Sequence, residues 1–226
     1  HYFYFGIRQL STFLGAIQYM ALKSNEISPK EGNEFVTTVD LKIQNELIFK
    51  LKEKYPNSFF ISEELKNEIT LLNHDLAKLE KGYIWIIDPL DGTHNYINEN
   101  NNFCTAVALV IDGIATASWI HTPTNGETLC ALANKGVWSN KVGTLRIAQH
   151  NVKNKKLLID HNNSGQLNRL MESYTIVKKM CRSATYASLI KGELDAAIFT
   201  DKKYIWDHLP GTFGFIQAGG LVGTFP

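Results

Sequence analysis

Residues 83–96 read Tyr-Ile-Trp-Ile-Ile-Asp-Pro-Leu-Asp-Gly-Thr-His-Asn-Tyr, and this stretch decides how the rest of the chain is interpreted. Its first five residues, 83–87, form an unbroken apolar run, which is typical of a strand buried on both faces. Residues 88–92, Asp-Pro-Leu-Asp-Gly, end that run, and Thr93 begins a short helical stretch. The sequence therefore predicts a buried strand that ends at residue 87 and delivers two carboxylates into a turn.

Two other segments also place a carboxylate where a strand ends or a helix begins. Glu63 follows a predicted strand at residues 58–62, and Asp207 lies at the start of a predicted helix. Asp88 and Asp91 stand three residues apart across a proline. Mg²⁺ prefers oxygen ligands, and metal-assisted hydrolysis of a phosphate needs several carboxylates from separate segments. Together the three segments indicate a candidate magnesium site.

Each of these segments has a simpler interpretation when it is taken alone. Asp88 and Gly92 suit a plain strand-to-helix turn, in which Asp caps the helix and Gly supplies a positive φ. Glu63 and Glu64 are typical of a solvated pair, and Asp207 suits a helix cap beside a core aromatic. Only the combination of the three segments favours a catalytic site over a purely structural role as turns, helix caps or a solvated pair.

The apolar periodicity of the whole chain predicts a layered α/β or α+β architecture. Two amphipathic helices are expected near the N-terminus, at residues 7–23 and Thr38–Lys54. An antiparallel meander is expected at residues 103–111, 115–121 and 127–133. Strands and helices then alternate at residues 157–160, 166–174, 175–179, 183–191 and 196–200, before a helix that starts near Trp206. We expect one domain over residues 1–226, with halves at about 1–145 and 146–226.

The composition argues against several classes of protein. The 226 residues carry 23 basic and 22 acidic side chains, a net charge of +1, so we expect no binding to nucleic acid or membranes. The 3 cysteines lack a C-x-x-C spacing and the 7 histidines lack an H-E-x-x-H pair, which disfavours a disulfide framework and a zinc hydrolase. The longest uncharged N-terminal run, residues 9–22, is shorter than the roughly 20 residues of a spanning helix. We therefore expect a cytoplasmic protein.

Four sequence blocks, taken together, resemble the inositol monophosphatase family of lithium-sensitive, magnesium-dependent phosphatases. Members carry V-T-x-x-D, then G-E-E after a strand, then W-I-I-D-P-[IL]-D-G-T-x-N-[FY], and finally W-D-x-x-x-G with E-A-G-G downstream. The corresponding segments here are residues 36–40, 62–64, 85–96, 206–211 and 218–220. They occur in the family's order over essentially the whole chain. The resemblance implies the α/β/α/β/α sandwich of the inositol monophosphatase and fructose-1,6-bisphosphatase type.

The resemblance also implies a set of metal ligands. Glu63, Asp88 and the Leu90 carbonyl are expected to hold one Mg²⁺ ion. Asp88, Asp91 and Asp207 are expected to hold a second. A third, weaker ion is expected at Glu63, so that the site takes two to three ions. Asp88 is shared by the first two ions, and its loss is expected to damage both.

Further roles in catalysis and phosphate binding follow from the same resemblance. Thr93, supported by Asp40, is expected to orient and help deprotonate the attacking water, and Glu63 belongs to this catalytic group through its ion. No covalent phosphoenzyme is expected. The backbone N–H groups of Gly92, Thr93 and His94 are expected to receive phosphate oxygens where the chain enters a helix.

The substrate-facing positions depart from the family pattern. Inositol-using members carry Glu seven residues before the W-D aspartate, where this chain has Thr200. Asp201 either replaces that Glu after a slip of one residue or belongs to an exposed turn. Tyr186 and Arg182 fall in a segment that faces the substrate in relatives. They are expected either to contact a sugar or a second anionic group, or to pack beneath the site.

Three functions fit these observations. The first is a sugar or inositol monophosphatase, expected to be a homodimer acting on a small phosphorylated substrate. The second is a relative that cleaves histidinol phosphate, fructose bisphosphate or a 3'-phosphonucleotide. The third is a non-catalytic regulator that binds RNA polymerase or RNA, which the intact carboxylates argue against. Family members continue through a further strand and helix after Ala-Gly-Gly, so we expect the present chain to lack that part.

Overall fold

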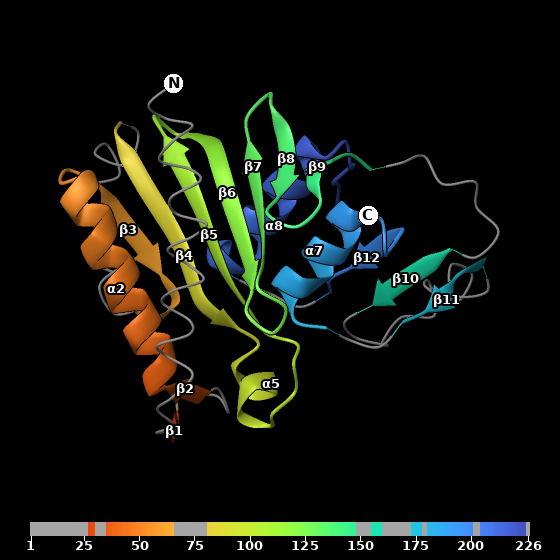
Figure 1. Ribbon diagram of the computed structural model, residues 1–226, viewed down its shortest axis with the longest axis horizontal. Helices are drawn as coiled ribbons and strands as arrows, with labels where there is room; N and C mark the ends of the chain where they lie inside the picture. Colours follow the sequence, from red (N-terminus) through yellow and green to blue (C-terminus); the bar gives the residue numbers. More distant parts are fainter. Residues whose placement is uncertain are drawn as a thin grey trace.

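The computed structural model describes residues 27–29, 35–65, 81–147, 155–159, 173–177, 180–200 and 204–224 (Figure 1). The helix predicted at residues 7–23, most of the helix predicted at 166–174, and Asp201 lie outside these residues. The described residues form three sheets with helices packed against them. This arrangement confirms the predicted layered α/β class.

A seven-stranded sheet forms the centre of the protein. Its strand order is β3-β4-β5-β6-β7-β8-β9, with β3 parallel to β4 and each later pair antiparallel. The strands are β3 (Phe59–Ser62), β4 (Tyr83–Asp91), β5 (Cys104–Ile111), β6 (Ile114–Thr122), β7 (Glu127–Leu132), β8 (Gly136–Ser139) and β9 (Gly143–Leu145). The predicted meander is confirmed as β5 to β7. The β8–β9 hairpin was missed, because strands of 4 and 3 residues are too short for a clear period of two.

Helix α2 (Thr38–Lys54) has the predicted bounds and covers one face of this sheet. Its apolar stripe packs against every second residue of β4 and against the neighbouring strands. The buried residues that α2 and β4 contribute to this cluster are Val39, Ile43, Leu47, Leu51, Trp85 and Ile87. The alternate β4 residues, Ile84 and Ile86, pack on the other face with Trp206. Strand β4 is therefore buried on both faces, as its unbroken apolar run predicts.

Helices α7 (Arg182–Lys191) and α8 (Ile205–Gln217) cover the opposite face. They pack closely because Gly211 of α8 lies against Tyr186 of α7, whose ring would be 2.1 Å from a Cβ at that position. Beyond them lies a parallel sheet in the order β11-β10-β12. Its strands are β10 (Lys156–Ile159), β11 (Thr175–Ile176) and β12 (Ala196–Ile198). Figure 1 shows α2 and this smaller sheet on opposite sides of the large sheet.

A third, two-stranded sheet lies just before α2. It pairs β1 (Ile27–Pro29) with β2 (Phe35–Thr37) in antiparallel register. The sequence predicted only a Pro- and Gly-containing break in this region. The hairpin leads directly into the first turn of α2, where Thr37 caps the helix.

The end of β4 differs from the prediction. The strand does not stop at Ile87 but continues to Asp91, and its register with β5 shifts between Asp88 and Asp91. Such an irregularity tolerates Pro89, which has no N–H to donate to a ladder. The Thr105 hydroxyl of β5 donates a hydrogen bond to the Pro89 carbonyl oxygen at 2.7 Å. A bulge held by the neighbouring strand, rather than a free turn, thus presents the two carboxylates.

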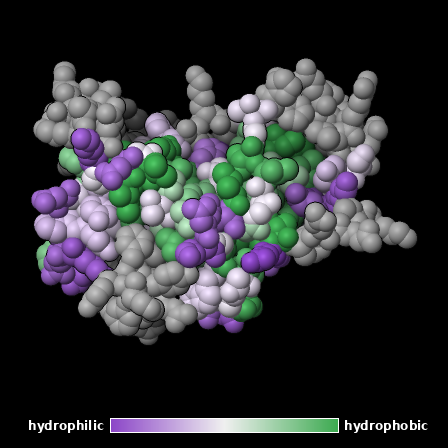
Figure 2. All heavy atoms as spheres, turned by 90° about the horizontal axis from the view of Figure 1, so that it is seen from above, coloured by the Kyte–Doolittle hydropathy of each residue, from purple (hydrophilic) through white to green (hydrophobic). Residues whose placement is uncertain are grey.

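The described surface is mixed in character. Figure 2 shows apolar and hydrophilic side chains interspersed over the described part of one face. None of the helices in the described ranges is both long and apolar enough to cross a membrane. The three cysteines are buried and free, as their spacing predicts.

His121 is a buried titratable group in the large sheet. It lies on β6 with 2% of its surface exposed, and its Nδ1 atom is 2.7 Å from Thr128 Oγ1 on β7. Burial disfavours the charged imidazolium and lowers the pKa of His121 from 6.5 to about 4. Between these two pH values the unfolded chain binds a proton that the folded protein does not.

We predict that the free energy of unfolding decreases as the pH falls from about 6.5 to about 4, since protons then favour the unfolded state. This contribution is fully present above about pH 6.5. The variant His121→Gln keeps a hydrogen-bonding group next to Thr128 but does not titrate, so its stability should depend less on pH in this window. Urea unfolding at several pH values measures both slopes. Equal slopes for the two proteins would contradict the prediction.

Candidate functional site

The predicted site residues gather at the edge of the large sheet where β3 and β4 end. This is the lower edge in Figure 1, where the 3₁₀ turn η1 (Glu63–Leu65) follows β3 and α5 (Thr93–Ile97) follows β4. Helices α2 and α7 begin at the same edge, as their hydrogen bonds to Thr93 and Asp91 show. Segments far apart in the sequence thus converge.

Asp88 is the most deeply buried carboxylate of the group, with 1% of its surface exposed. Its Oδ1 atom has no hydrogen-bond partner among the residues that the structure describes. Burial raises the pKa of Asp88 well above its ordinary value, and the negative charges of Glu63, Asp91 and Asp207 raise it further. A hydrogen bond between the Glu63 and Asp88 carboxyl groups adds to this rise in pKa. Three carboxylates, Asp91 from the same strand and Glu63 and Asp207 from other segments, therefore act on one buried acid.

Asp91 lies at the end of the β4 bulge and is also buried. The backbone N–H of Ser183, in the first turn of α7, donates a short hydrogen bond to its Oδ2 atom. Burial raises the pKa of Asp91, while the Ser183 hydrogen bonds and the Arg182 charge oppose that rise. The α7 N-terminus therefore holds Asp91 in place and partly compensates its negative charge.

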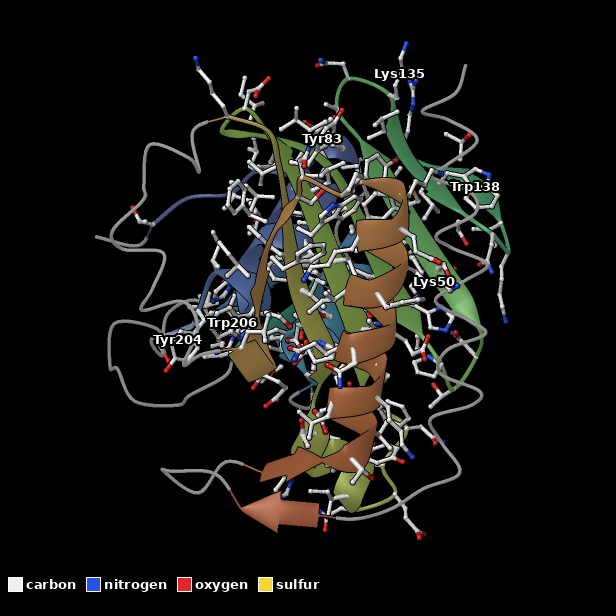
Figure 3. The ribbon with its side chains drawn as sticks, turned by 90° about the vertical axis from the view of Figure 1, so that its left-hand side faces the viewer. Lys50, Tyr83, Lys135, Trp138, Tyr204 and Trp206 are labelled. Carbon is white, nitrogen blue, oxygen red and sulfur yellow. The ribbon has the colours of Figure 1, made fainter. Side chains whose placement is uncertain are left out.

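Asp207 is fixed by the start of α8. Its neighbour Trp206 is buried against Ile84 and Ile86, and the Trp206 ring stacks on Tyr204 at 4.6 Å between centroids. Figure 3 shows these two aromatic side chains side by side. The Tyr204 N–H donates to Asp207 Oδ2 at 2.7 Å. The aromatic anchor therefore sets where the Asp207 carboxylate lies.

These carboxylates are electrostatic neighbours but do not form a ready coordination shell. Within the described ranges, no three His, Cys, Asp or Glu side chains are arranged as ligands around one ion. Backbone N–H groups engage one oxygen each of Asp91 and Asp207. Asp88 fits a bound cation most directly, because its buried Oδ1 has no other partner and three like charges surround it. The complete ligand set remains a prediction.

Thr93 connects the β4 bulge to α2. Its hydroxyl oxygen lies 3.1 Å from Asp40 Oδ1 and 3.0 Å from the Leu90 carbonyl oxygen, so its single proton has two alternative acceptors. Asp40 is completely buried, and its Oδ2 atom accepts hydrogen bonds from the Thr37 N–H at 2.7 Å and the Thr37 hydroxyl at 2.5 Å. This capping box at the start of α2 fixes the acceptor for Thr93.

Gly92 permits the sharp entry into α5. Its φ of 89° lies in the left-handed region, and a Cβ there would lie 2.8 Å from the Asn102 carbonyl oxygen. The adjacent His94 side chain is exposed and packs toward Asn98 rather than into the site. Any contribution of His94 to phosphate binding would therefore come from its backbone N–H, and that role stays a prediction.

The positions predicted to contact the substrate lie in different surroundings. Thr200 is exposed, and Asp201 lies outside the described residues. Tyr186 is buried, and its hydroxyl is 2.9 Å from His208 Nδ1. Its ring packs against Phe199, over which the Arg182 guanidinium lies at 5.4 Å from the ring centroid. The structure thus joins Tyr186 and Arg182 in one aromatic and cationic cluster.

Two of the contacts that hold the site were missed in the sequence. Ser183 acts through its backbone N–H, which leaves no signature in the sequence. Gln44 accepts hydrogen bonds from both Ser62 and Glu64, on either side of Glu63. A signal for Gln44 existed, because a polar residue four positions after Asp40 interrupts the buried face of α2.

Sequence comparison decides the family. The model of the inositol monophosphatase family matches residues 12–225. The chain belongs to the inositol monophosphatase family. The matched range includes all five predicted metal-ligating residues, Glu63, Asp88, Leu90, Asp91 and Asp207.

Individual members of the family show the range of related proteins. The Inositol-1-monophosphatase of Bacillus subtilis (strain 168) is 24% identical over 201 residues, which cover 85% of this chain and 73% of that protein. The Nus factor SuhB of Escherichia coli (strain K12) is 30% identical over 115 residues, 51% of this chain and 40% of that protein. Family membership alone is therefore compatible with both a phosphatase and a regulatory protein.

Solved structures of the family share the fold. An IMPase/NADP phosphatase complexed with Mg²⁺ and phosphate has a TM-score of 0.76, with 18% identity, over 95% of this chain and 83% of that chain. At this identity the likeness shows the architecture. It agrees with the layered arrangement described above.

We predict that Asp88→Asn stabilises the metal-free protein. The change replaces a buried carboxyl group whose ionisation is disfavoured by burial and by its acidic neighbours, and whose Oδ1 atom is unsatisfied; a buried unsatisfied polar atom costs about 1–3 kcal/mol. With EDTA present, the melting temperature should rise by about 2–4 °C for each kcal/mol gained. Mg²⁺ should raise the melting temperature of the wild type but not that of the variant.

Asp195→Asn is the control, because Asp195 is exposed and accepts a hydrogen bond from the Lys156 N–H away from the site. It should show no gain in EDTA and a normal response to Mg²⁺. A lower melting temperature for Asp88→Asn than for the wild type in EDTA would contradict the prediction, because it would show that the Asp88 carboxylate stabilises the metal-free protein.

Proposed function

We propose that the protein is a magnesium-dependent phosphatase that hydrolyses a small phosphate monoester with water. The buried, unpaired Oδ1 atom of Asp88, surrounded by the charges of Glu63, Asp91 and Asp207, is the observation that carries this proposal. Clustered carboxylates of this kind are unfavourable unless a cation compensates them. Hydrolysis of a phosphate ester is the reaction for which such a cluster is suited.

Five groups would hold the ions: the side chains of Glu63, Asp88, Asp91 and Asp207 and the carbonyl of Leu90. When bound, Mg²⁺ lowers the pKa of water and compensates the charge on the phosphate and the leaving oxygen. Asp88 is the carboxylate on which all the others act, and the family resemblance implies that both ions would depend on it. The protein's own contribution is to hold these oxygens at fixed positions.

Thr93 and Asp40 would handle the proton of the attacking water. When the Thr93 hydroxyl donates its hydrogen bond to Asp40 Oδ1 rather than to the Leu90 carbonyl, its oxygen would accept a hydrogen bond from water, and Asp40 would receive the Thr93 proton as Thr93 takes one from the water. Asp40 keeps this orientation because Thr37 occupies its other oxygen. The water is thereby oriented for attack on phosphorus without a covalent intermediate.

The phosphate would lie against the start of α5. There the backbone N–H groups of Gly92, Thr93 and His94 belong to the first turn, which has no intrahelical acceptor for them. A side chain at position 92 would collide with the Asn102 carbonyl oxygen, so the segment keeps its tight path only with glycine. Close approach of backbone to phosphate favours the same residue.

The leaving group would face the cluster of Arg182, Tyr186, Phe199 and His208. This cluster combines a guanidinium with three rings and differs from the carboxylate that inositol-using members place near residue 200. It favours substrates with a second anionic or an aromatic group over plain polyol phosphates. Histidinol phosphate, a bisphosphate or a phosphonucleotide therefore fits this cluster better than inositol 1-phosphate does.

Regulation of the kind that the name Nus factor gives to the Escherichia coli relative is the second candidate. That function alone requires no carboxylates buried against one another. The unpaired oxygen of Asp88 favours hydrolysis for this reason.

We predict that EDTA abolishes phosphatase activity and that Mg²⁺ restores it, with Li⁺ and excess Ca²⁺ acting as inhibitors. Asp207→Asn should lower kcat by about 100-fold or more, since even indirect partners of a metal ligand change function by about 10–100-fold. Asp112→Asn is a matched control, because Asp112 likewise accepts a backbone N–H, from Gly82 at 2.8 Å, but lies in an exposed turn. If both variants keep wild-type rates, Asp207 is only a helix cap.

We also predict that inositol 1-phosphate is used no better than other small phosphate esters, because Thr200 offers one neutral hydroxyl where a carboxylate would accept hydrogen bonds from a polyol. The measurement is kcat/KM for inositol 1-phosphate, glycerol 2-phosphate, histidinol phosphate and fructose 1,6-bisphosphate. If Asp201 replaces the missing Glu, Asp201→Ala should reduce kcat/KM selectively for the polyol phosphates. A strong preference for inositol 1-phosphate that Asp201→Ala leaves intact would refute both versions.

A further inference from the structure

Glu63 lies directly after the end of strand β3. Among the residues that the structure describes, strand β3 is the edge of the large sheet and pairs with β4. Its ladder ends at Ser62, paired with Ile87, and Glu63 begins the short turn η1, which contains no buried residue. The direction of the Glu63 side chain therefore depends on how the chain is held on either side of it.

One side chain of α2, that of Gln44, holds the residues on both sides of Glu63 by hydrogen bonds. The Oε1 atom of Gln44 accepts a short hydrogen bond from the Ser62 hydroxyl and a second from the Glu64 N–H at 3.2 Å. Gln44 is 2% exposed and Ser62 is fully buried. Residues on both sides of Glu63 are therefore tied to one oxygen atom in a site shielded from water, where such bonds are costly to lose.

The same face of α2 also fixes the other arm of the site. Asp40 stands four residues before Gln44, which places both side chains on one side of the helix. Asp40 is 3.1 Å from the Thr93 hydroxyl, and Gln44 holds the segment of Glu63. Core residues of α2 pack against β4, so the helix cannot shift relative to the β4 bulge without breaking that cluster.

We propose that Gln44 is a positioning residue for metal binding: its Oε1 atom, by holding Ser62 and Glu64, sets the direction in which Glu63 faces Asp88. The proposal rests on the proposed metal-dependent function. Gln44 acts through Glu63 and does not itself touch the ion. One helix thereby keeps the separation of Glu63 and Thr93 constant.

The chemistry of Gln44 and Ser62 suits this role. The amide of Gln44 accepts two hydrogen bonds without adding another negative charge to a region where Glu63, Asp91 and Asp207 already raise the pKa of Asp88. Ser62 stands where the family usually has Gly, and its hydroxyl supplies one of the two donors.

The test is isothermal titration of the EDTA-treated, dialysed full chain with MgCl₂, with melting temperatures measured in parallel. Gln44→Met keeps the shape of the side chain and removes the acceptor, and should weaken Mg²⁺ binding by about 10-fold. Gln44→Glu keeps an acceptor oxygen and should bind within about threefold of the wild type. Ile43→Val, on the same helix, should lower the melting temperature and leave the affinity for Mg²⁺ unchanged.

The outcomes separate this inference from the proposed function. A wild-type protein that binds no Mg²⁺ refutes both. A wild type that binds Mg²⁺ with the same affinity as Gln44→Met refutes only the role of Gln44, even if the variant is less stable. If Gln44→Met does not fold, Ser62→Ala replaces it and should weaken binding in the same direction by about threefold. Unchanged affinity in Ser62→Ala then overturns the proposal.

Discussion

The close packing of several acidic side chains around Asp88 is the constraint on which the rest of the structure depends. Asp88 is buried with an unpaired oxygen while Glu63, Asp91 and Asp207 all disfavour its ionisation. Such a group destabilises a folded chain by itself, so the surrounding elements must hold the carboxylates together against their repulsion. Strain of this kind at one point of an otherwise well-packed fold is typical of a functional site.

The scaffold meets this constraint with apolar packing and helix starts. The β4 strand is buried between α2 on one face and Trp206 on the other, so the position of its bulge is fixed from both sides. Helices α7 and α8 then present their first turns to the carboxylates. Ser183 donates to Asp91, and Tyr204 donates to Asp207. Each acid is thereby fixed by backbone, which leaves less freedom for the charges to move apart.

Much of the fold was predictable from the sequence, because apolar periodicity and turn-forming residues determine helices, strands and hairpins over short stretches of chain. The bounds of α2, the meander β5 to β7 and the burial of residues 84–87 follow from apolar spacing alone. The bulge at Asp88 was not predictable, since Asp-Pro-Leu-Asp-Gly is equally suited to a turn and only pairing with β5 decides. Gln44 and Ser183 act across 18 or more positions of sequence. The polar Gln44 on the buried face of α2 was a local signal, but no local pattern identifies its partners, and the backbone N–H of Ser183 leaves no signature at all.

The proposed role of Asp88 as the shared ligand of a divalent cation site can be tested by anomalous X-ray diffraction from crystals of the full chain soaked in Mn²⁺, an oxygen-preferring substitute for Mg²⁺. We expect anomalous peaks at bonding distance from Asp88 and from at least two of Glu63, Asp91 and Asp207. Peaks elsewhere on the surface, with none beside Asp88, would contradict it.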